Sequence, residues 1–276
     1  MTRYRFALRP KWILSHLFVL ALVAAMMTAG FWQLSRRDEK RSRNEQITQR
    51  ATLAVTPVGD LLDGPDAATD GLEYRVASAS GTYLPEQVMI RSRSLGGQPG
   101  SWVVTPLRLD DGRVVLVNRG FFYNNGQLTE VPARYAPPAG EVEVVGLLRE
   151  TQTRGSIGAK DADEGHLTNL ARLDVERIAR QVDGPVLPMY LSLEDQRPSL
   201  GPDDPTPVPR EDLDEGPHFG YAVQWFIFTA IAVIGYPLIL RRRANELEKE
   251  ARARAAASAE GEDEGEPAGE DAQPSP

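Results

Sequence analysis

The sequence contains no cysteine and only three histidines, His16, His166 and His218. Without cysteine, the chain cannot form disulfides, bind an iron–sulfur cluster or hold a metal through thiolates. Three scattered histidines also argue against a zinc site made by the protein alone. Acidic residues outnumber basic ones, 39 against 31, which argues against nucleic acid as a partner.

Familiar enzyme motifs are also missing. The sequence has no glycine-rich phosphate loop, no nucleophile elbow and no pair of metal ligands on one helix. His166 lies in a Gly/Asp-rich loop, which is typical of a solvated histidine, although the sequence leaves a Ser–His–Asp arrangement open. We therefore expect a protein that is not an enzyme, and a membrane-tethered enzyme of the cell envelope is the weakest alternative.

Two long apolar runs, residues 12–34 and 220–240, are the main positive feature. Each is long enough to cross a bilayer as a helix, which takes about 20 residues. The first run follows a basic segment, residues 1–11, as a signal peptide does. Its apolar core is longer than the roughly 7–15 residues of signal peptides, and residues 27–29 make a poor cleavage site. The sequence thus favours an uncleaved anchor over a cleaved signal.

The basic residues around the second run predict its orientation. Arg241, Arg242 and Arg243 follow it directly, while Arg210 is the only nearby basic residue before it. Positive charge favours the cytoplasmic side, so residues 241–276 are predicted to be cytoplasmic. Two spans then place residues 1–11 on the same side and residues 35–219 outside. This makes a multi-pass protein with both termini in the cytoplasm.

Short β-rich runs separated by turn residues fill the segment between the anchors. They predict strands over residues 73–83, 86–93, 101–109, 113–122, 141–150 and 186–193. A helix is predicted over 174–182 with Asp174 as its N-cap. The expected fold class is a membrane protein with two transmembrane helices flanking an extracytoplasmic β-rich α+β domain, mainly of antiparallel sheet. A proline-rich lead-in, 197–217, joins this domain to the second span.

Several local features carry narrower expectations. Asn118, Arg119 and Gly120 interrupt an apolar strand, and a glycine there indicates a bulge or a close backbone approach. Arg119 either forms a salt bridge within the domain, which is the favoured interpretation, or contacts an anionic group such as a propionate.

Alanines at 21, 25 and 29 have the spacing of a helix–helix contact in membranes. His16 is either a ligand or an ordinary interfacial histidine, and we favour the second.

Beyond the second span, the helix is expected to run to about residue 257. The remaining acidic, low-complexity segment, 258–276, is expected to be disordered.

Seven motifs occur in one order along the chain, each weak alone but specific together. They are GFWQL (30–34) with the basic run after it and Lys40, YRVASASGTY (74–83), VVTPL (103–107), VLVNRGFF (115–122), VEVVGLLR (142–149), PMYLSL (188–193) and HFGYAVQWFIF (218–228). With them, nearly the whole chain except its C-terminal tail resembles the Surf-one family (surfeit-locus proteins, Shy-one in yeast). The Ala/Arg/Gly/Asp-rich composition is typical of a high-GC bacterium, so the expected location is the bacterial plasma membrane.

The resemblance implies an assembly factor for haem–copper cytochrome c oxidase, which assists delivery or insertion of haem a into subunit I. It implies oxidase subunit I and haem a synthase as partners and haem a as a transiently bound cofactor. It also implies His218 as the ligand of the haem iron and Trp32 as a neighbour. The alternative is a double-anchored scaffold that stabilises an oxidase intermediate without haem.

The residues around His218 support the same interpretation. Neutral imidazole is a good iron ligand, and haem iron is commonly held by an axial histidine. On a helix, His218, Tyr221 or Ala222, and Trp225 share one face, where the aromatic rings could contact a flat macrocycle. The simpler alternative is an interfacial histidine beside an ordinary aromatic anchor.

Overall fold

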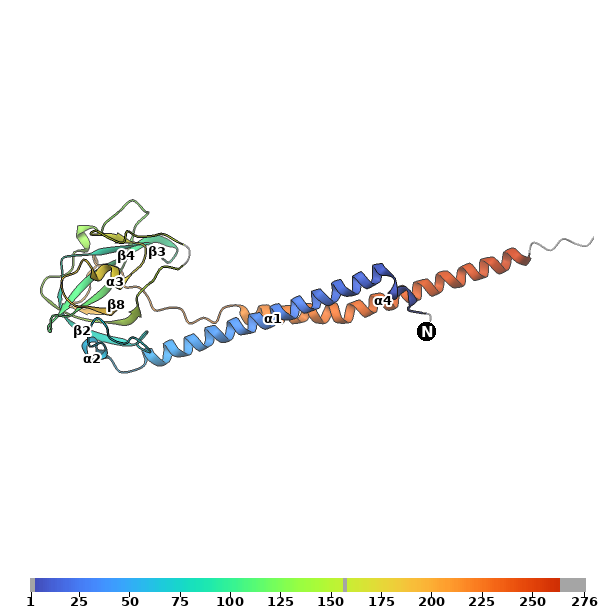
Figure 1. The fold of residues 1–276 in the computed structure, drawn as a ribbon, viewed down its shortest axis with the longest axis horizontal. Coiled ribbons are helices and arrows are strands. Elements are labelled where there is room, and N and C mark those ends of the chain that lie inside the picture. Colours follow the sequence, from blue (N-terminus) through green and yellow to red (C-terminus); the bar gives the residue numbers. More distant parts are fainter. Residues whose placement is uncertain (1–2, 156–157, 264–276) are drawn as a thin grey trace, which may run out of the picture. The chain divides into compact units, whose positions relative to one another are not determined.

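A computed structural model describes residues 3–155 and 158–263. The chain divides into two compact units. The helical unit comprises the residues up to Ser42 and those from Asp214 onward, and the sheet unit comprises Arg43–Leu213. Figure 1 shows the ribbon, coloured along the sequence.

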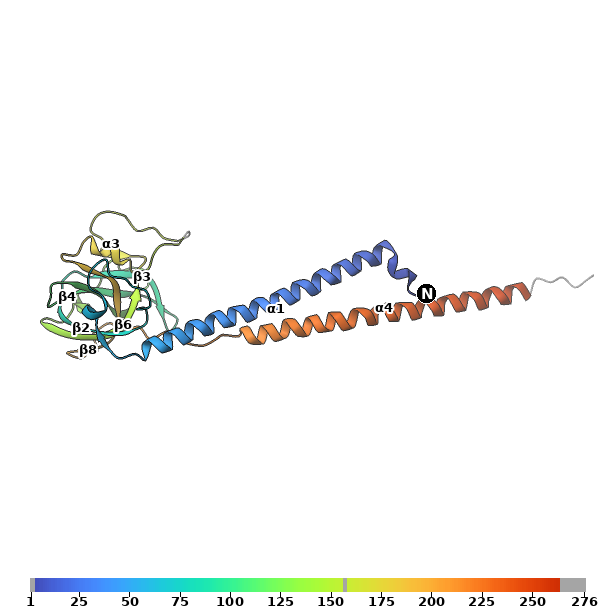
Figure 2. The ribbon, with the colours of Figure 1, turned by 60° about the horizontal axis from the view of Figure 1, so that its bottom comes forward.

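The helical unit is built from two long helices. A short 3-10 helix, η1 (Arg5–Leu8), precedes α1 (Pro10–Ala51), and α4 (His218–Asp263) follows the sheet unit in the sequence. Proline at the first position of α1 is favourable, because the amide hydrogen it lacks would have no partner in the helix. Figures 1 and 2 show the two helices side by side, and contacts at both ends of their common length make them antiparallel.

The contact between the helices follows a regular spacing. A row of less exposed residues runs along α1, with spacings that alternate between four and three residues. They are Val19, Val23, Met26, Gly30 and Gln33. This 3.5-residue repeat is the seam of a left-handed coiled coil. The spacing therefore explains why the two helices can stay in contact over several turns.

The small residues at 21, 25 and 29 do not form this seam as expected. Ala21 and Ala25 are exposed, and only Ala29 lies at its edge. At Gly30 the ring of Phe226 lies against α1, because a Cβ added there would be 2.8 Å from the ring. Phe31 adds an edge-to-face contact with the same ring, with centroids 5.4 Å apart.

The outer faces of both helices are apolar and exposed. In the most apolar stretch of α1 only 11% of the residues are buried, and in that of α4 only 6%. The exposed side chains include Leu14, Leu17, Phe18, Leu20, Ile227, Ile231, Val233, Ile234, Leu238 and Ile239. By length and composition these are two candidate membrane spans, the first near the N-terminus.

The C-terminal end of α4 lies beyond its predicted position. The helix continues to Asp263, so residues 258–263 are helical and their predicted disorder is wrong. Alanine and glutamate, which dominate residues 244–257 just before this extension, are strong helix formers. The rest of the predicted acidic tail, 264–276, lies outside the described residues.

The sheet unit contains a closed ring of strands. Its strands are β1 (Thr56–Pro57), β2 (Val76–Tyr83), β3 (Val88–Leu95), β4 (Gln98–Leu109), β5 (Val114–Tyr123), β6 (Glu141–Glu150), β7 (Asn169–Leu170) and β8 (Val186–Arg197). Their order is β1-β2-β6-β8-β5-β4-β3-β7, and an additional pairing joins β2 to β4. The strands β2, β6, β8, β5 and β4 therefore close on themselves as a small barrel.

The sheet is mixed, so the expectation of a mainly antiparallel sheet is wrong. β1 pairs with β2, β3 with β7, and β5 with β8 in parallel. β5 carries this signal in its sequence, because it is buried along almost its whole length rather than on alternate residues. Continuous apolar strands are typical of parallel pairing, in which both faces of the sheet are covered.

Two apolar clusters fill the two sides of the barrel wall. Alternate residues of the ring strands point inward and pack with Val58 and Leu62 of the segment around the short helix α2 (Val58–Leu61). Outward-facing residues of β3, β4, β5 and β8 pack under α3 (Val175–Ala179), through Val175 and Ile178. The predicted N-cap is confirmed, because the Asp174 side chain accepts a hydrogen bond from the Arg177 amide at 3.0 Å.

The predicted interruption of β5 is a bulge. The register between β4 and β5 shifts between Val103 and Val104, and Gly120 has a φ of +138°. Arg119 is completely buried and forms an ion pair with Asp204 at 2.9 Å. The expectation that Arg119 has a structural role is therefore confirmed.

Ion pairs and hydrogen bonds hold the first and the last residues of the sheet unit against its barrel. Glu211 accepts hydrogen bonds from Arg43 and from Arg149 of β6, both at 2.8 Å. Arg43 also donates to the Tyr74 hydroxyl at 3.0 Å. The Asn44 side chain donates to the Leu213 carbonyl, so the end of the lead-in lies beside the last turns of α1.

Candidate functional site

The predicted histidine is held in a defined orientation by the other helix. His218 is the first residue of α4, and its Nδ1 lies 2.8 Å from the side-chain oxygen Oε1 of Gln33 on α1. An amide oxygen can only accept, so Nδ1 is the donor of this hydrogen bond, and in the tautomer that is protonated at Nδ1 the lone pair is on Nε2. In metal-binding histidines, a hydrogen bond at the ring nitrogen that does not bind the metal fixes the tautomer and the orientation of the ring.

Charged side chains lie around the turn that begins α4. Glu215, just before the helix, pairs with Arg37 at 2.9 Å, and the Arg37 guanidinium lies 5.1 Å from the centroid of the Phe219 ring. Gly216 has a φ of +73°, and its amide donates to the Asp214 side chain at 3.0 Å. A Cβ at Gly216 would lie 3.8 Å from His218 Nε2 and 3.3 Å from Lys40 Nζ.

Two of the predicted aromatic residues, Tyr221 and Trp225, follow His218 on α4. Trp225 is half-buried two turns after His218, and its ring meets Phe228 at 6.1 Å. Tyr221 is 51% exposed, whereas Ala222 is completely buried and takes the place on the helix contact. Their assignment to haem binding stays a prediction.

Trp32 is adjacent to Gln33 and therefore level with His218 along the helix pair. Trp32 is 52% exposed, and the Arg36 guanidinium lies over its ring, 5.7 Å from the centroid. The ring thus remains available on the outer surface of α1.

A second polar cluster lies at the opposite end of the helix pair. The Tyr236 hydroxyl lies 2.6 Å from His16 Nδ1 and 2.9 Å from Ser15 Oγ. His16 Nε2 lies 3.1 Å from the Ala7 carbonyl, which can only accept. Both ring nitrogens of His16 are therefore engaged within the protein, and neither is free for a ligand.

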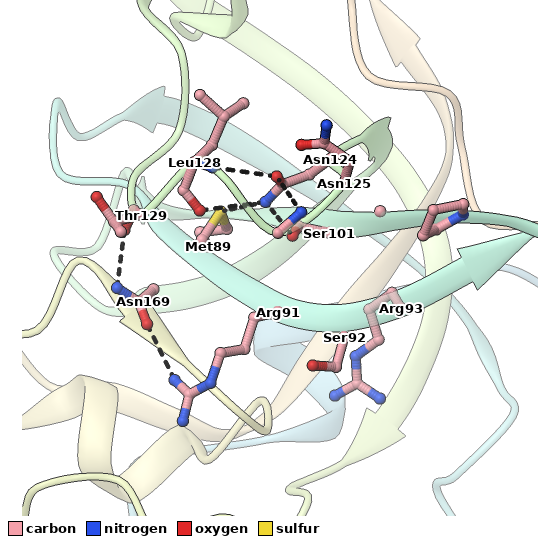
Figure 3. Close-up of a pocket in the computed structure, with 13 residues that line it drawn as sticks. Met89, Arg91, Ser92, Arg93, Ser101, Asn124, Asn125, Leu128, Thr129 and Asn169 are labelled. Atoms are coloured by element: carbon pink, nitrogen blue, oxygen red, sulfur yellow. Dashed lines mark hydrogen bonds between the residues drawn. The ribbon is translucent and has the colours of Figure 1, made fainter.

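The sheet unit holds a pocket of about 400 Å³ between β3, β4 and the loop after β5 (Figure 3). Asn124 lies at its base and donates to Ser101 Oγ and to the Leu128 carbonyl. Asn169 links Thr129 to Arg91, whose guanidinium also pairs with Asp161. Asn124, Asn169 and Arg91 are thus hydrogen-bonded within the protein, whereas the buried Nε of Arg93, which also lines the pocket, has no hydrogen-bond partner among the described residues.

The described part of the chain contains no group of three or more His, Cys, Asp or Glu that could hold a metal ion. His166 is exposed, in line with the solvated loop histidine that its surroundings predict. The arrangement around His218 thus offers a single oriented imidazole nitrogen, nearby cations and exposed aromatic rings.

Three residues of this site were not predicted. Gln33, Lys40 and Gly216 come next to His218 only through the register of the two helices and the turn before α4. The one signal for Gln33 is its position, because it is an uncharged polar residue at the end of an apolar run.

The chain is similar to proteins from bacteria and eukaryotes. The family model described as SURF1 family matches residues 20–230. A SURF1-like protein of Mycobacterium tuberculosis is 31% identical over 257 residues, which cover 90% of this chain and 91% of the relative. A SURF1-like protein of Rickettsia bellii is 27% identical over 82% of this chain and 90% of its own. Surfeit locus protein 1 of Takifugu rubripes is 30% identical over 54% of this chain and 68% of its own. The chain therefore belongs to the SURF1 family, the surfeit-locus family that its seven motifs indicate.

Proposed function

We propose that this protein is an assembly factor for haem–copper cytochrome c oxidase, and that it helps to deliver haem a to subunit I. Membership of the SURF1 family supports oxidase assembly. One observation supports the role of haem: Gln33 accepts from His218 Nδ1, which leaves Nε2 free to ligate iron. Haem a, when bound, supplies the iron that this nitrogen would hold. Trp225, Tyr221 and Trp32 would offer aromatic surface to the macrocycle.

We also propose that α1 and α4 cross the bacterial plasma membrane, with both termini in the cytoplasm and the sheet unit outside. The exposed apolar side chains on both helices support this, because they would lose contact with water in a bilayer. The run Arg241–Arg243 at the end of the second span supports the orientation. His218 would then lie at the outer boundary of the membrane.

A reporter enzyme that is active only outside the cytoplasm tests this topology. Fused after Pro276, it is expected to be silent. Inserted after Gly97, at the turn between β3 and β4, it is expected to be active. A strong signal from the first fusion would contradict the proposed orientation.

The haem proposal is tested by the absorption spectrum of detergent-purified protein that has been co-expressed with haem a synthesis. We expect the parent protein to carry haem a and His218→Ala to lose at least nine-tenths of it, with a similar loss of active oxidase in membranes. Gln33→Leu should weaken binding by about tenfold, because partners that orient a ligand typically contribute 10–100-fold to affinity. Trp32→Ala should have a smaller effect.

His166→Ala is the matched control, because it removes an exposed histidine from the sheet unit. Full haem occupancy and full oxidase in His218→Ala would contradict the haem proposal. A parent protein that never carries haem, in cells where its deletion still lowers oxidase, would favour the scaffold that acts through protein contacts alone.

A further inference from the structure

Lys40 is an unpaired cation beside the histidine. It lies on α1 and is exposed, and it has no carboxylate partner among the residues that the structure describes. The two basic residues one turn before it are both neutralised. Arg36 pairs with Glu39 at 2.7 Å, and Arg37 pairs with Glu215 at 2.9 Å. Lys40 is therefore the basic residue of this turn that forms no ion pair within the described part of the chain.

The turn before α4 brings this ammonium close to the ring. A Cβ at Gly216 would be 3.3 Å from Lys40 Nζ and 3.8 Å from His218 Nε2. Both distances are measured from the same Cβ position. The Lys40 Nζ and His218 Nε2 atoms therefore cannot be farther apart than the sum of these two distances. Gly216 keeps this space open, since it has no side chain and its φ of +73° is one that other residues rarely adopt.

We propose that Lys40 binds a carboxylate of the ligand whose iron is held by His218. This inference rests on the proposed function, and it adds a specificity determinant to the same site. An iron porphyrin of the haem class carries two propionate carboxylates on its rim, while its iron lies at its centre. A metal ligand and a cation that flank the same glycine can bind both features of such a molecule.

The chemistry of lysine suits this role. Its ammonium is a compact charge on a flexible stem, so it can follow a carboxylate on a mobile propionate chain. At a membrane boundary the effective dielectric constant is below that of water, which strengthens an ion pair. A ligand that must later be released is served by one such contact rather than by a fixed bidentate clamp.

The test compares two probes, ferric protoporphyrin IX and its dimethyl ester, in which both carboxylates are blocked. The full-length protein in detergent is titrated with each probe, and the Soret band gives the dissociation constants. We expect the parent protein to bind the diacid about tenfold more tightly than the ester, a difference of about 1.4 kcal/mol. Lys40→Gln should bring this ratio close to one without weakening ester binding, and Lys40→Arg should preserve the ratio.

Arg36→Gln is the matched control. Arg36 lies one helical turn before Lys40 and is already paired with Glu39, so the substitution removes a nearby positive charge without removing the unpaired one. It is expected to keep the ratio of the parent. Differences in probe solubility cancel, since each variant is judged by the ratio between the same two probes.

The outcomes separate this inference from the proposed function. The proposed role of Lys40 is wrong if the parent binds both probes equally, or if Lys40→Gln keeps the same ratio of dissociation constants as the parent. Neither result would contradict the haem proposal. An equal loss in Arg36→Gln would also overturn it, because general positive potential would then explain the preference. If the parent binds neither probe, both proposals fall. His218→Ala should weaken both probes alike.

Discussion

Gly120→Val is expected to destabilise the sheet unit by about 3–5 kcal/mol, in the range of the most damaging single substitutions. Gly120 has a φ of +138°, a backbone conformation that β-branched residues hardly ever adopt. A Cβ there would also lie 2.3 Å from the backbone oxygen of Thr206, so backbone atoms would have to move.

The movement would break a second feature of the fold. Phe121 and Thr206 exchange two backbone hydrogen bonds, at 2.7 and 2.9 Å, which hold the lead-in against β5. A displaced Thr206 would lose these bonds next to the buried pair of Arg119 and Asp204. Strain and lost pairing therefore act together at Gly120.

Amide hydrogen exchange in β4 and β5 of the full-length protein measures this loss directly. Gly64→Val is the control, because Gly64 has no unusual φ and a Cβ added to it would meet no atom within 4 Å. It should change stability by less than about 0.5 kcal/mol. Equal exchange rates in the two variants would show that Gly120 has no special backbone role.

Local sequence signals predicted most of the strands and their turns. The six predicted strands correspond to β2, β3, β4, β5, β6 and β8, with ends that differ by a few residues. Asp174 caps α3 as expected, and the turn at Gly112 closes with a hydrogen bond from its amide to the Leu109 carbonyl. Each of these features depends on residues close together in the sequence, which is why the sequence reveals them.

The pairing of the strands could not be predicted in the same way. β5 and β8 pair in parallel although β6, β7 and α3 lie between them in the sequence. β1 and β7 contain two residues each, too few for any periodic pattern. Both short strands exist because a neighbouring strand offers free backbone groups, which is a property of the folded sheet.

The candidate site likewise combines features that the local sequence reveals with contacts that only the fold creates. A histidine at the start of an apolar run is visible in the sequence, and so is its place on a helix. Its partner Gln33 lies 185 residues away, and the choice of Ala222 over Tyr221 for the helix contact depends on the rotation of α4. Such contacts follow from helix register, which small-residue spacing at 21, 25 and 29 failed to indicate.

Asp204→Asn is expected to cost about 3 kcal/mol, because it leaves the buried charge of Arg119 without its counter-ion. Arg119 is completely buried, and burial lowers the pKa of its guanidinium, while Tyr83 and Asp204 oppose that shift. The remaining partner of the guanidinium is the Tyr135 carbonyl at 2.7 Å, together with the ring of Tyr83 at 5.5 Å. Neither supplies a negative charge.

The neighbouring Asp203 provides the control, since it is exposed and Asp203→Asn removes the same charge from the same loop. Urea unfolding of the sheet unit within the full-length protein should show less than about 0.5 kcal/mol for it. Arg119→Met combined with Asp204→Asn should be more stable than Asp204→Asn alone, because removing both charges removes the unpaired one. If the double variant is the less stable of the two, or if Asp204→Asn is as mild as its control, the ion pair does not stabilise the barrel in this way.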